Sequence, residues 1–189
     1  MNGIIFRKAL PDDLDDIVLI IKEAKKRMKD AGRTQWQGAY PGISDIMHDI
    51  NSGYGYVAET SGYTSGDSIC GCLKEGKVLI AGYCAVIFNG EPAYENLEGR
   101  WLSDSDYVVV HRMAVSGKML GSGVSKEMFR AVSELACSHG ISSFKVDTNH
   151  DNVQMNHILK SLGFSECGTI NYADGPRIAY EKILDGPAV

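Results

Sequence analysis

The sequence predicts a mixed α/β fold, and three observations support this prediction. Short β-branched segments alternate with amphipathic helical segments in the order β-α-α-β-β-β-α-β-α-β-β. The composition, 44% hydrophobic and 23% charged, is that of a globular protein. The length of 189 residues suits one domain that is large enough to bury a core. We therefore expect a single domain over residues 1–189.

The composition also excludes several functional classes. A net charge of -5 argues against nucleic-acid binding. No apolar run approaches the length of a membrane span, and no secretion signal precedes the first strand, so we expect a cytoplasmic protein without membrane contact. The five cysteines include no C-x-x-C pair, and Cys70 and Cys72 lack a histidine cluster, so we expect reduced thiols and no metal site.

The first elements are a strand and two helices. Ile4 to Ala9 is a short apolar strand, and Pro11 then begins a helix whose first turn is rich in aspartate. Gly32 ends that helix. Ile43 to Asn51 is a second, short amphipathic helix.

Between these two helices lies a polar and aromatic segment without helical or strand periodicity. Trp36 and Tyr40 in this segment combine apolar area with a hydrogen-bonding tip, which suits the wall of an acceptor pocket. The alternative is that Trp36 fills the core between the two helices. Both interpretations are open from the sequence.

Two antiparallel strands are predicted next, over Tyr54 to Glu59 and Val78 to Phe88. The Gly- and Ser-rich segment from Thr60 to Gly76 is interpreted as an extended hairpin loop. Gly90 to Asp106 is a longer connection that carries Tyr94 and Trp101. This connection either borders an acceptor site or covers a sheet edge.

The most informative stretch is a strand, a glycine loop and a helix in succession. Val108 to Val115 is apolar and β-branched, and Val124 to His139 has a helical apolar face. Gly117, Gly121 and Gly123 lie between them, where the backbone can bend tightly and approach a ligand. A helix N-terminus behind such a loop offers free N–H groups to a phosphate.

Three known glycine motifs do not fit this loop. The P-loop needs G-x-x-x-x-G-K-S/T, whereas Gly117 and Gly121 are too close together. The dinucleotide motif G-x-G-x-x-G fails at Lys126, and the G-x-S-x-G nucleophile elbow is absent around Ser122. The pattern that fits is a basic residue followed by x-x-G-x-G, running from Lys118 to Gly123 directly after the strand.

The last third of the chain repeats strand and helix. Phe144 to Thr148 is a strand, and Asp151 with Gln154 resembles a capping box for a helix that ends at Gly163. Two closing strands follow, over Phe164 to Gly168 and Arg177 to Ile183.

On these motifs the chain resembles the GNAT superfamily of N-acetyltransferases. The strand end and Lys118-Met-Leu-Gly121-Ser-Gly123 are similar to the family's cofactor loop, although Arg or Gln is usual at the first position. The strand, Asn152, helix and Gly163-Phe164 are similar to a second family motif. The resemblance implies a central mixed, mostly antiparallel twisted sheet of about seven strands, with a splayed parallel pair and about four flanking helices.

The resemblance also implies acetyl-CoA as co-substrate, without a metal. Main-chain groups of Met113 and Val115 would bind pantetheine, and the Met113 N–H would donate to the thioester carbonyl as an oxyanion donor. Loop amides would bind the pyrophosphate, assisted by Ser125 and Asn152. The implied cofactor-binding set is Met113, Ala114, Val115, Lys118, Met119, Leu120, Gly121, Ser122, Gly123, Val124, Ser125 and Asn152.

His111 is the candidate general base, because a neutral imidazole can take a proton near physiological pH. It lies two residues before Met113, so simple strand alternation predicts that both side chains share a sheet face. The alternative is a buried histidine bonded to a main-chain carbonyl. Leu159 occupies the position where the family often has a tyrosine as general acid, so the acid stays unassigned.

The expected function is acetyl transfer from acetyl-CoA to a primary amine by direct attack in a ternary complex. The acceptor class is a small-molecule or peptide amine, and Trp36 and Tyr40 are its candidate contacts. A non-catalytic acyl-CoA-binding module is the alternative, which Leu159 keeps open. A nucleotide-binding switch is disfavoured by the failed P-loop match. A homodimer is common in the family, but nothing in this sequence fixes one.

Overall fold

The computed structural model describes residues 4–60, 78–88 and 90–185. Its helices and strands are β1 (Ile4–Lys8), α1 (Leu14–Asp30), α2 (Ile43–Asn51), β2 (Gly55–Thr60), β3 (Leu79–Phe88), β4 (Glu98–Gly99), β5 (Tyr107–Val115), α3 (Val124–Ser138), β6 (Ser143–Asn149), α4 (Val153–Ser161), β7 (Ser165–Tyr172) and β8 (Gly175–Ile183). Short 3₁₀ turns are η1 (Pro11–Asp13), η2 (Pro92–Asn96) and η3 (Gly117–Met119). The predicted hairpin loop after Thr60, with Cys70 and Cys72, lies outside the described residues.

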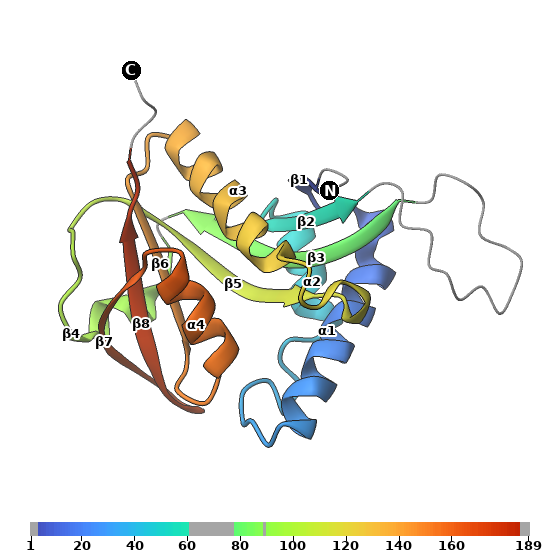
Figure 1. The fold of residues 1–189 in the computed structure, drawn as a ribbon, viewed down its shortest axis with the longest axis horizontal. Coiled ribbons are helices and arrows are strands. Elements are labelled where there is room, and N and C mark those ends of the chain that lie inside the picture. Colours follow the sequence, from blue (N-terminus) through green and yellow to red (C-terminus); the bar gives the residue numbers. More distant parts are fainter. Residues whose placement is uncertain (1–3, 61–77, 89, 186–189) are drawn as a thin grey trace, which may run out of the picture.

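The strands form one twisted sheet in the order β1-β2-β3-β5-β6-β8-β7-β4. Neighbouring strands of this described sheet are antiparallel except β5 and β6, which run parallel. α1 and α2 cover one face, whereas α3 and α4 cover the other (Figure 1). The predicted mixed, mostly antiparallel sheet with four flanking helices is confirmed. The two-residue β4, within the predicted Gly90–Asp106 connection, adds an eighth strand to the expected seven.

Each face of the sheet has its own core. On the α3 and α4 face, Met128 and Phe129 pack with Phe144 and with Leu159, and all four side chains are buried. On the α1 and α2 face, the buried side chains come chiefly from α1 and from the strands beneath it, including Ile17, Ile20, Ile21, Val57 and Tyr83. Among the described helices, none has both the length and the apolar composition that a membrane crossing requires.

The parallel strands β5 and β6 separate along their length. Their paired residues run from Tyr107 with Ser143 to Val109 with Lys145. β5 nevertheless continues to Val115 and β6 to Asn149. The predicted splay of this pair is therefore confirmed, and it opens the sheet at the carboxyl ends of both strands (Figure 1).

A β-bulge in β5 lies at the start of this opening. Tyr83 of β3 pairs with Ala114, but Ala85 pairs with His111, so β5 carries one extra residue between the two pairs. Arg112 in this interval has a φ of 56°. The bulge reverses the alternation of side chains beyond it, so that Met113 packs on the α3 face. The expected common face for His111 and Met113 is thus wrong, because simple alternation does not hold across a bulge.

The start of α4 also differs from the prediction. Asn152, rather than Asp151, is the N-cap residue, and its side-chain oxygen accepts from the Met155 N–H. The chain makes a turn after β6, in which the Asn152 N–H donates to the Asn149 carbonyl, and the helix begins one residue later than expected. The Asp151 carboxylate instead accepts from the Thr34 N–H across the gap to the segment after α1.

Candidate functional site

A cleft of about 740 Å³ lies where the parallel strands separate. One wall comes from the C-terminal half of α1 and the segment after it, and the opposite wall comes from α4. The end of β5 and the loop after it form the floor, including Met113, Leu120 and Gly121. Apolar surface predominates in this lining, which suits a long, flexible ligand with an apolar arm.

The glycine loop has a defined conformation. Gly121 has a φ of 74° and Gly123 a φ of 88°, in the left-handed region that glycine adopts without steric cost. The Ser122 hydroxyl donates to the Met119 carbonyl within the loop. From α1, Glu23 accepts from the Gly117 N–H at 2.7 Å. These contacts hold the loop against α1 and fix the direction in which its amides point.

The N-terminus of α3 has amides available for an anion. The first helical hydrogen bonds run from the Lys126 and Glu127 N–H groups to the Gly123 carbonyl. The Val124 and Ser125 N–H groups come before these first helical donors in the chain, and Ser125 lines the cleft. The positive end of the helix dipole lies at the same place. This arrangement fits the phosphate-binding geometry that the sequence predicted.

The end of β5 directs main-chain groups into the opening. Because the Ser116 N–H donates to Ala81, the neighbouring pair Val115 and Gly82 is of the type without direct hydrogen bonds. The Val115 amide and carbonyl therefore point toward the side where β6 has separated. The Arg27 guanidinium of α1 donates to this carbonyl at 2.8 Å. The Val115 carbonyl is thus already bonded, which leaves its amide as the better group for a ligand.

The structure brings together seven of the predicted cofactor residues in the lining of this cleft: Met113, Ala114, Val115, Leu120, Gly121, Ser125 and Asn152. The remaining predicted residues belong to the same loop and helix start but not to that lining: Lys118, Met119, Ser122, Gly123 and Val124. The Val124 side chain is buried in the core, so only its main chain can face a ligand.

Asn152 is held by both walls of the cleft. Its Oδ1 accepts from Met155 in α4 and, at 3.2 Å, from the Arg33 guanidinium on the opposite wall. Arg33 also donates to Gln154. Asn152 is buried, and a bond from its side chain to a ligand must come from Nδ2, because Oδ1 is engaged.

A smaller pocket of about 60 Å³ adjoins the cleft. Trp36, Tyr40 and His111, which the sequence singled out separately, line it together. The two cavities share four lining residues: Met28, Met113, Asn152 and Met155. Trp36 also packs against the core beneath α1, so the core interpretation of this residue is confirmed, and its contact with an acceptor stays a prediction. Because it holds the predicted acceptor contacts Trp36 and Tyr40, the smaller pocket is called the acceptor pocket below.

Two residues with strained backbone conformations line the acceptor pocket. Trp36, with a φ of 63°, and Arg112, with a φ of 56°, are the non-glycine residues with positive φ in the described chain, and both line this pocket. Such conformations are costly for residues with a side chain, and they occur preferentially at functional sites.

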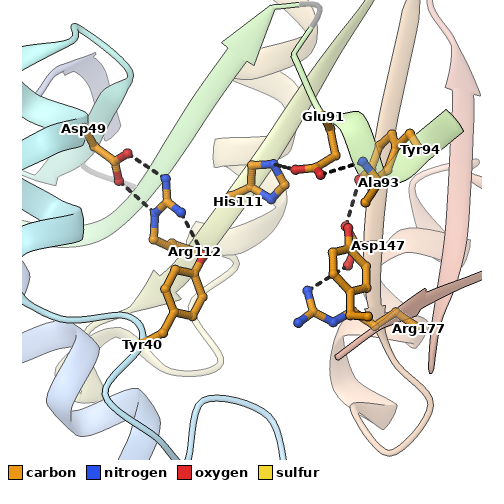
Figure 2. A network of polar contacts seen from close by, with 10 residues as sticks. Tyr40, Asp49, Glu91, Ala93, Tyr94, His111, Arg112, Asp147 and Arg177 are labelled. Atoms are coloured by element: carbon orange, nitrogen blue, oxygen red, sulfur yellow. Dashed lines mark hydrogen bonds and ion pairs between the residues drawn. The ribbon is translucent and has the colours of Figure 1, made fainter. Parts of the chain in front are cut away.

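His111 is bonded to a carboxylate that sequence reasoning did not assign. Its Nε2 lies 2.9 Å from the Glu91 Oε2, and Glu91 also accepts from the Ala93 N–H (Figure 2). The bond to His111 is the main reason why the pKa of Glu91 lies below its ordinary value. Because an ionised carboxylate only accepts hydrogen bonds, the Nε2 atom carries the proton. A neutral His111 then has its lone pair on Nδ1, which is turned away from Glu91.

On the other side of the pocket, Arg112 is fixed by α2. Asp49 is fully buried and accepts from Arg112 Nε at 2.8 Å and from Nη2 at 2.6 Å. The Tyr83 hydroxyl donates to the same carboxylate at 2.5 Å. The remaining Arg112 nitrogen, Nη1, donates to the Tyr40 hydroxyl at 2.7 Å (Figure 2). Burial disfavours the Arg112 charge, but the hydrogen bonds and charge interactions with Asp49 and Tyr40 together outweigh it and raise the Arg112 pKa.

A second buried ion pair closes the pocket from β6 and β8. Asp147 accepts from Arg177 Nη1 at 3.2 Å and from the Tyr94 hydroxyl at 2.9 Å (Figure 2). Tyr94 is buried behind this ion pair, and Trp101 packs against the Tyr94 ring. Tyr94 and Trp101 therefore support the pocket without lining it. Glu91, Asp147 and Arg177 were missed because a sequence shows no contact between residues this far apart in the chain. The only available signal was their place on the predicted connection and strands.

Leu159 has no access to either cavity. Its side chain is fully buried in the core under α4. His157, four residues after the first residue of α4, lines the large cleft instead. Within the described residues, no group of three or more histidine, cysteine or acidic side chains is placed to hold a metal.

Comparisons with known proteins agree with this geometry. The model of the acetyltransferase (GNAT) family matches residues 35–164. A GNAT family acetyltransferase from Streptococcus agalactiae is 34% identical, over 97% of this chain and 96% of its own, with a TM-score of 0.80. The chain belongs to the GNAT acetyltransferase family. The family uses acetyl-CoA for acyl transfer to amines of peptides or small molecules.

More distant structures share the GNAT fold alone. An acetyltransferase of the family from Listeria monocytogenes is 22% identical, over 97% of this chain and 98% of its own, with a TM-score of 0.70. A chain of the NatC complex, solved with Gag peptide and CoA, is 12% identical over 97% of this chain and 99% of its own, with a TM-score of 0.65. A comparison with curated proteins gave no match.

Proposed function

We propose that this GNAT protein transfers an acetyl group from acetyl-CoA to a primary amine, by direct attack within a ternary complex. One observation carries the proposal. The large cleft and the acceptor pocket meet at Met113 and Asn152, and His111, paired with Glu91, lies in the acceptor pocket. A base beside the junction of a cofactor site and a small polar pocket is what acyl transfer to an amine needs.

The cofactor would lie along the end of β5 with its phosphates at the start of α3. The Val115 amide points into the opening, and the amides of Gly121 to Ser125 surround the helix N-terminus. Met113 follows the bulge and lines both cavities, so its N–H is our candidate for the donor to the thioester carbonyl oxygen.

His111 would act as the base. Its Nδ1 accepts a proton from the ammonium or from the attacking amine, and Glu91 stabilises the imidazolium that forms. The amine nitrogen forms a bond to the acetyl carbon, and the carbon–sulfur bond breaks. The electron pair of that bond leaves with the sulfur, and the thiolate then takes a proton.

Tyr40 is our candidate for the group that supplies this proton. It is the phenol that lines the acceptor pocket, and its oxygen accepts from Arg112, so its own O–H proton is directed elsewhere. Tyr40 is partly exposed, but the desolvation of its hydroxyl within the pocket raises the pKa of Tyr40, and the phenol therefore keeps its proton at neutral pH. This assignment replaces the tyrosine that the family often has at the position of Leu159.

We expect the Tyr40→Phe variant to lose about a hundredfold in kcat, the low end of what a positioned acid contributes, because water reaches this exposed side chain. Steady-state kinetics, with CoA affinity measured in parallel, check this. The matched control is Tyr54→Phe, which removes a partly exposed phenol outside the pocket. A Tyr40→Phe enzyme with the kcat of the control would remove Tyr40 from the mechanism.

The acyl-CoA-binding module without catalysis is the second candidate, because the family's usual acid position holds Leu159. Both candidates require CoA binding, and only the first requires turnover. CoA release in the presence of a panel of primary amines therefore separates them. Binding without release for any amine would favour the module.

We expect the Gly121→Val variant to bind CoA about tenfold more weakly, because a β-branched residue at a φ of 74° costs roughly 1–2 kcal/mol and displaces the loop amides. Isothermal titration calorimetry measures this loss. Gly140→Val is the matched control, since Gly140 has the same φ of 74° and equal space for a side chain, but lies at the far end of α3. Equal CoA affinity in both variants, or no binding by the native protein, would contradict the proposed cofactor site.

A further inference from the structure

Two residues that line the acceptor pocket each carry a buried polar atom without a hydrogen-bond partner. Gln35 is only 8% exposed, and its Oε1 accepts no hydrogen bond. The Arg177 Nε is also buried, and its N–H donates to no atom of the described chain. Both residues line the acceptor pocket. A buried polar atom without a partner costs about 1–3 kcal/mol, so a ligand that satisfies both atoms gains affinity from each.

The two atoms require different hydrogen-bonding groups on a ligand. Gln35 Oε1 needs an N–H donor, which the reacting amine itself can supply. Arg177 Nε needs an oxygen acceptor on the same ligand. A pocket of about 60 Å³ holds roughly four to six non-hydrogen atoms at 10–15 Å³ each. The amine and the oxygen must therefore be separated by only a few bonds.

The charges around the pocket determine whether an anionic or a neutral oxygen fits beside Arg177. The Arg177 guanidinium already donates to Asp147 at 3.2 Å and to Asp174 at 3.0 and 3.1 Å. Arg112 is likewise paired with Asp49, and Glu91 adds another carboxylate beside His111. No unpaired cation is left in the described lining for an anionic ligand. A neutral carbonyl can accept from Arg177 without adding a further negative charge beside Asp147.

We infer that the acceptor is a primary amine whose neighbouring carbon carries a neutral carbonyl, as in an amino-acid amide or the amino end of a peptide. The inference rests on the proposed acetyl transfer. In this arrangement the amine donates to Gln35 Oε1, and the carbonyl oxygen accepts from Arg177 Nε. Gln35 and Arg177 then determine specificity and are positioned by elements far apart in the chain.

Paired kinetics with alaninamide and isopropylamine test this inference. The ratio of their kcat/KM values is measured for the native protein and for the Gln35→Leu and Arg177→Lys variants. Comparing ratios cancels the different basicities of the two amines. We expect the ratio to fall about tenfold in Arg177→Lys, because only alaninamide has the carbonyl that loses a hydrogen bond of roughly 1.4 kcal/mol. Gln35→Leu should lower kcat/KM about tenfold for both amines and leave the ratio unchanged, because both substrates present the amine that Gln35 accepts from. Arg100→Lys, an exposed arginine outside both cavities, is the control that leaves the ratio unchanged.

Gln35→Leu is the safer of the two variants, because it removes an unsatisfied buried acceptor and replaces it with a side chain of similar size. A ratio that Arg177→Lys leaves unchanged, or kcat/KM values that Gln35→Leu leaves unchanged for both amines, would overturn the inference, while turnover of both amines would leave the proposed function intact. Absence of turnover with every amine would instead contradict the proposed function.

Alanine, corrected for its free-amine fraction, should react more slowly than alaninamide, and the reverse order would overturn the preference for a neutral carbonyl. An alanyl tripeptide that reacts faster than alaninamide would assign the amino end of a peptide as the source, and equal rates would assign the small amide.

Discussion

We expect kcat of the His111→Gln variant to fall by about 10²–10⁴-fold, the contribution of a positioned general base. Glutamine keeps an N–H that can donate to Glu91, but it has no basic nitrogen to replace Nδ1. CoA affinity should change little, because His111 lines the acceptor pocket and not the large cleft. The measurement is kcat and kcat/KM for acetyl-CoA and a reactive amine, with calorimetry for CoA.

The pH dependence separates the role of His111 from that of its partner. The bond from His111 lowers the pKa of Glu91 below its ordinary value of 4.5. The stability that this carboxylate contributes is therefore present above about pH 4.5 and is lost as the pH falls through its lowered pKa. Glu91 is ionised throughout the range in which histidine titrates. An acid limb of the rate above the titration range of Glu91 then does not come from that carboxylate, and His111→Gln should abolish it if the limb belongs to the base.

Two further variants make this result specific. His48→Gln removes an exposed histidine of α2 outside both cavities and should leave kcat and the acid limb in place. Glu91→Gln keeps a hydrogen-bond acceptor for His111 but removes the charge that stabilises an imidazolium, and should cost less than His111→Gln. If His111→Gln matched His48→Gln in rate and pH profile, the base would lie elsewhere.

Local sequence patterns were sufficient for the glycine loop and the elements beside it. A β-branched strand, glycines at two left-handed positions and an amphipathic helix are each specified within a few residues. The predicted helix start at Val124 is the observed one, and Gly121 and Gly123 have the positive φ values that make glycine necessary there. This part of the cleft could therefore be predicted from the sequence.

The acceptor pocket depends on contacts that no local pattern encodes. The bulge at Arg112 follows from the pairing of β5 with β3, and it places His111 and Met113 on different faces. His111 meets Glu91 and Arg177 meets Asp147 only after distant segments pack together. Propensity and periodicity describe one element at a time, so they predicted the presence of a histidine here but not its partner.

Competition between nearby caps explains the error at α4. Asp151 and Asn152 are both good N-cap residues, and the sequence favoured Asp151 because Gln154 completes a capping box. In the fold, the segment after α1 approaches the same turn, so that Thr34 donates to Asp151 and Arg33 donates to Gln154. Both side chains are thereby used across the cleft, and Asn152 caps the helix.

The second large effect concerns stability. We expect the Asp49→Ala variant to lose about 3–5 kcal/mol of unfolding free energy, the cost of removing one partner from a buried ion pair. Asp49 is fully buried, and its loss leaves the Arg112 guanidinium and the Tyr83 hydroxyl without their acceptor. At roughly 2–4 °C per kcal/mol for a chain of this size, Tm should fall by roughly 6–20 °C.

The ion pair itself need not stabilise the fold in comparison with apolar residues of similar volume, because desolvation opposes the attraction between the charges. The double variant Asp49→Leu with Arg112→Met should therefore recover most of the lost Tm, since it leaves no buried charge. Its activity should nevertheless stay low. Arg112 also donates to Tyr40, and apolar residues cannot hold that hydroxyl in place.

In the double variant we therefore expect stability to recover and activity to stay low. This difference tests whether the buried ion pair serves the fold or the acceptor pocket. Circular dichroism melts and steady-state rates, measured on the native protein, Asp49→Leu, Arg112→Met and the double variant, complete a thermodynamic cycle. Recovery of Tm without recovery of kcat would assign the pair to the positioning of Tyr40. Recovery of both would show that Asp49 and Arg112 act only on the fold, and Tyr40 would then need another group to direct its proton.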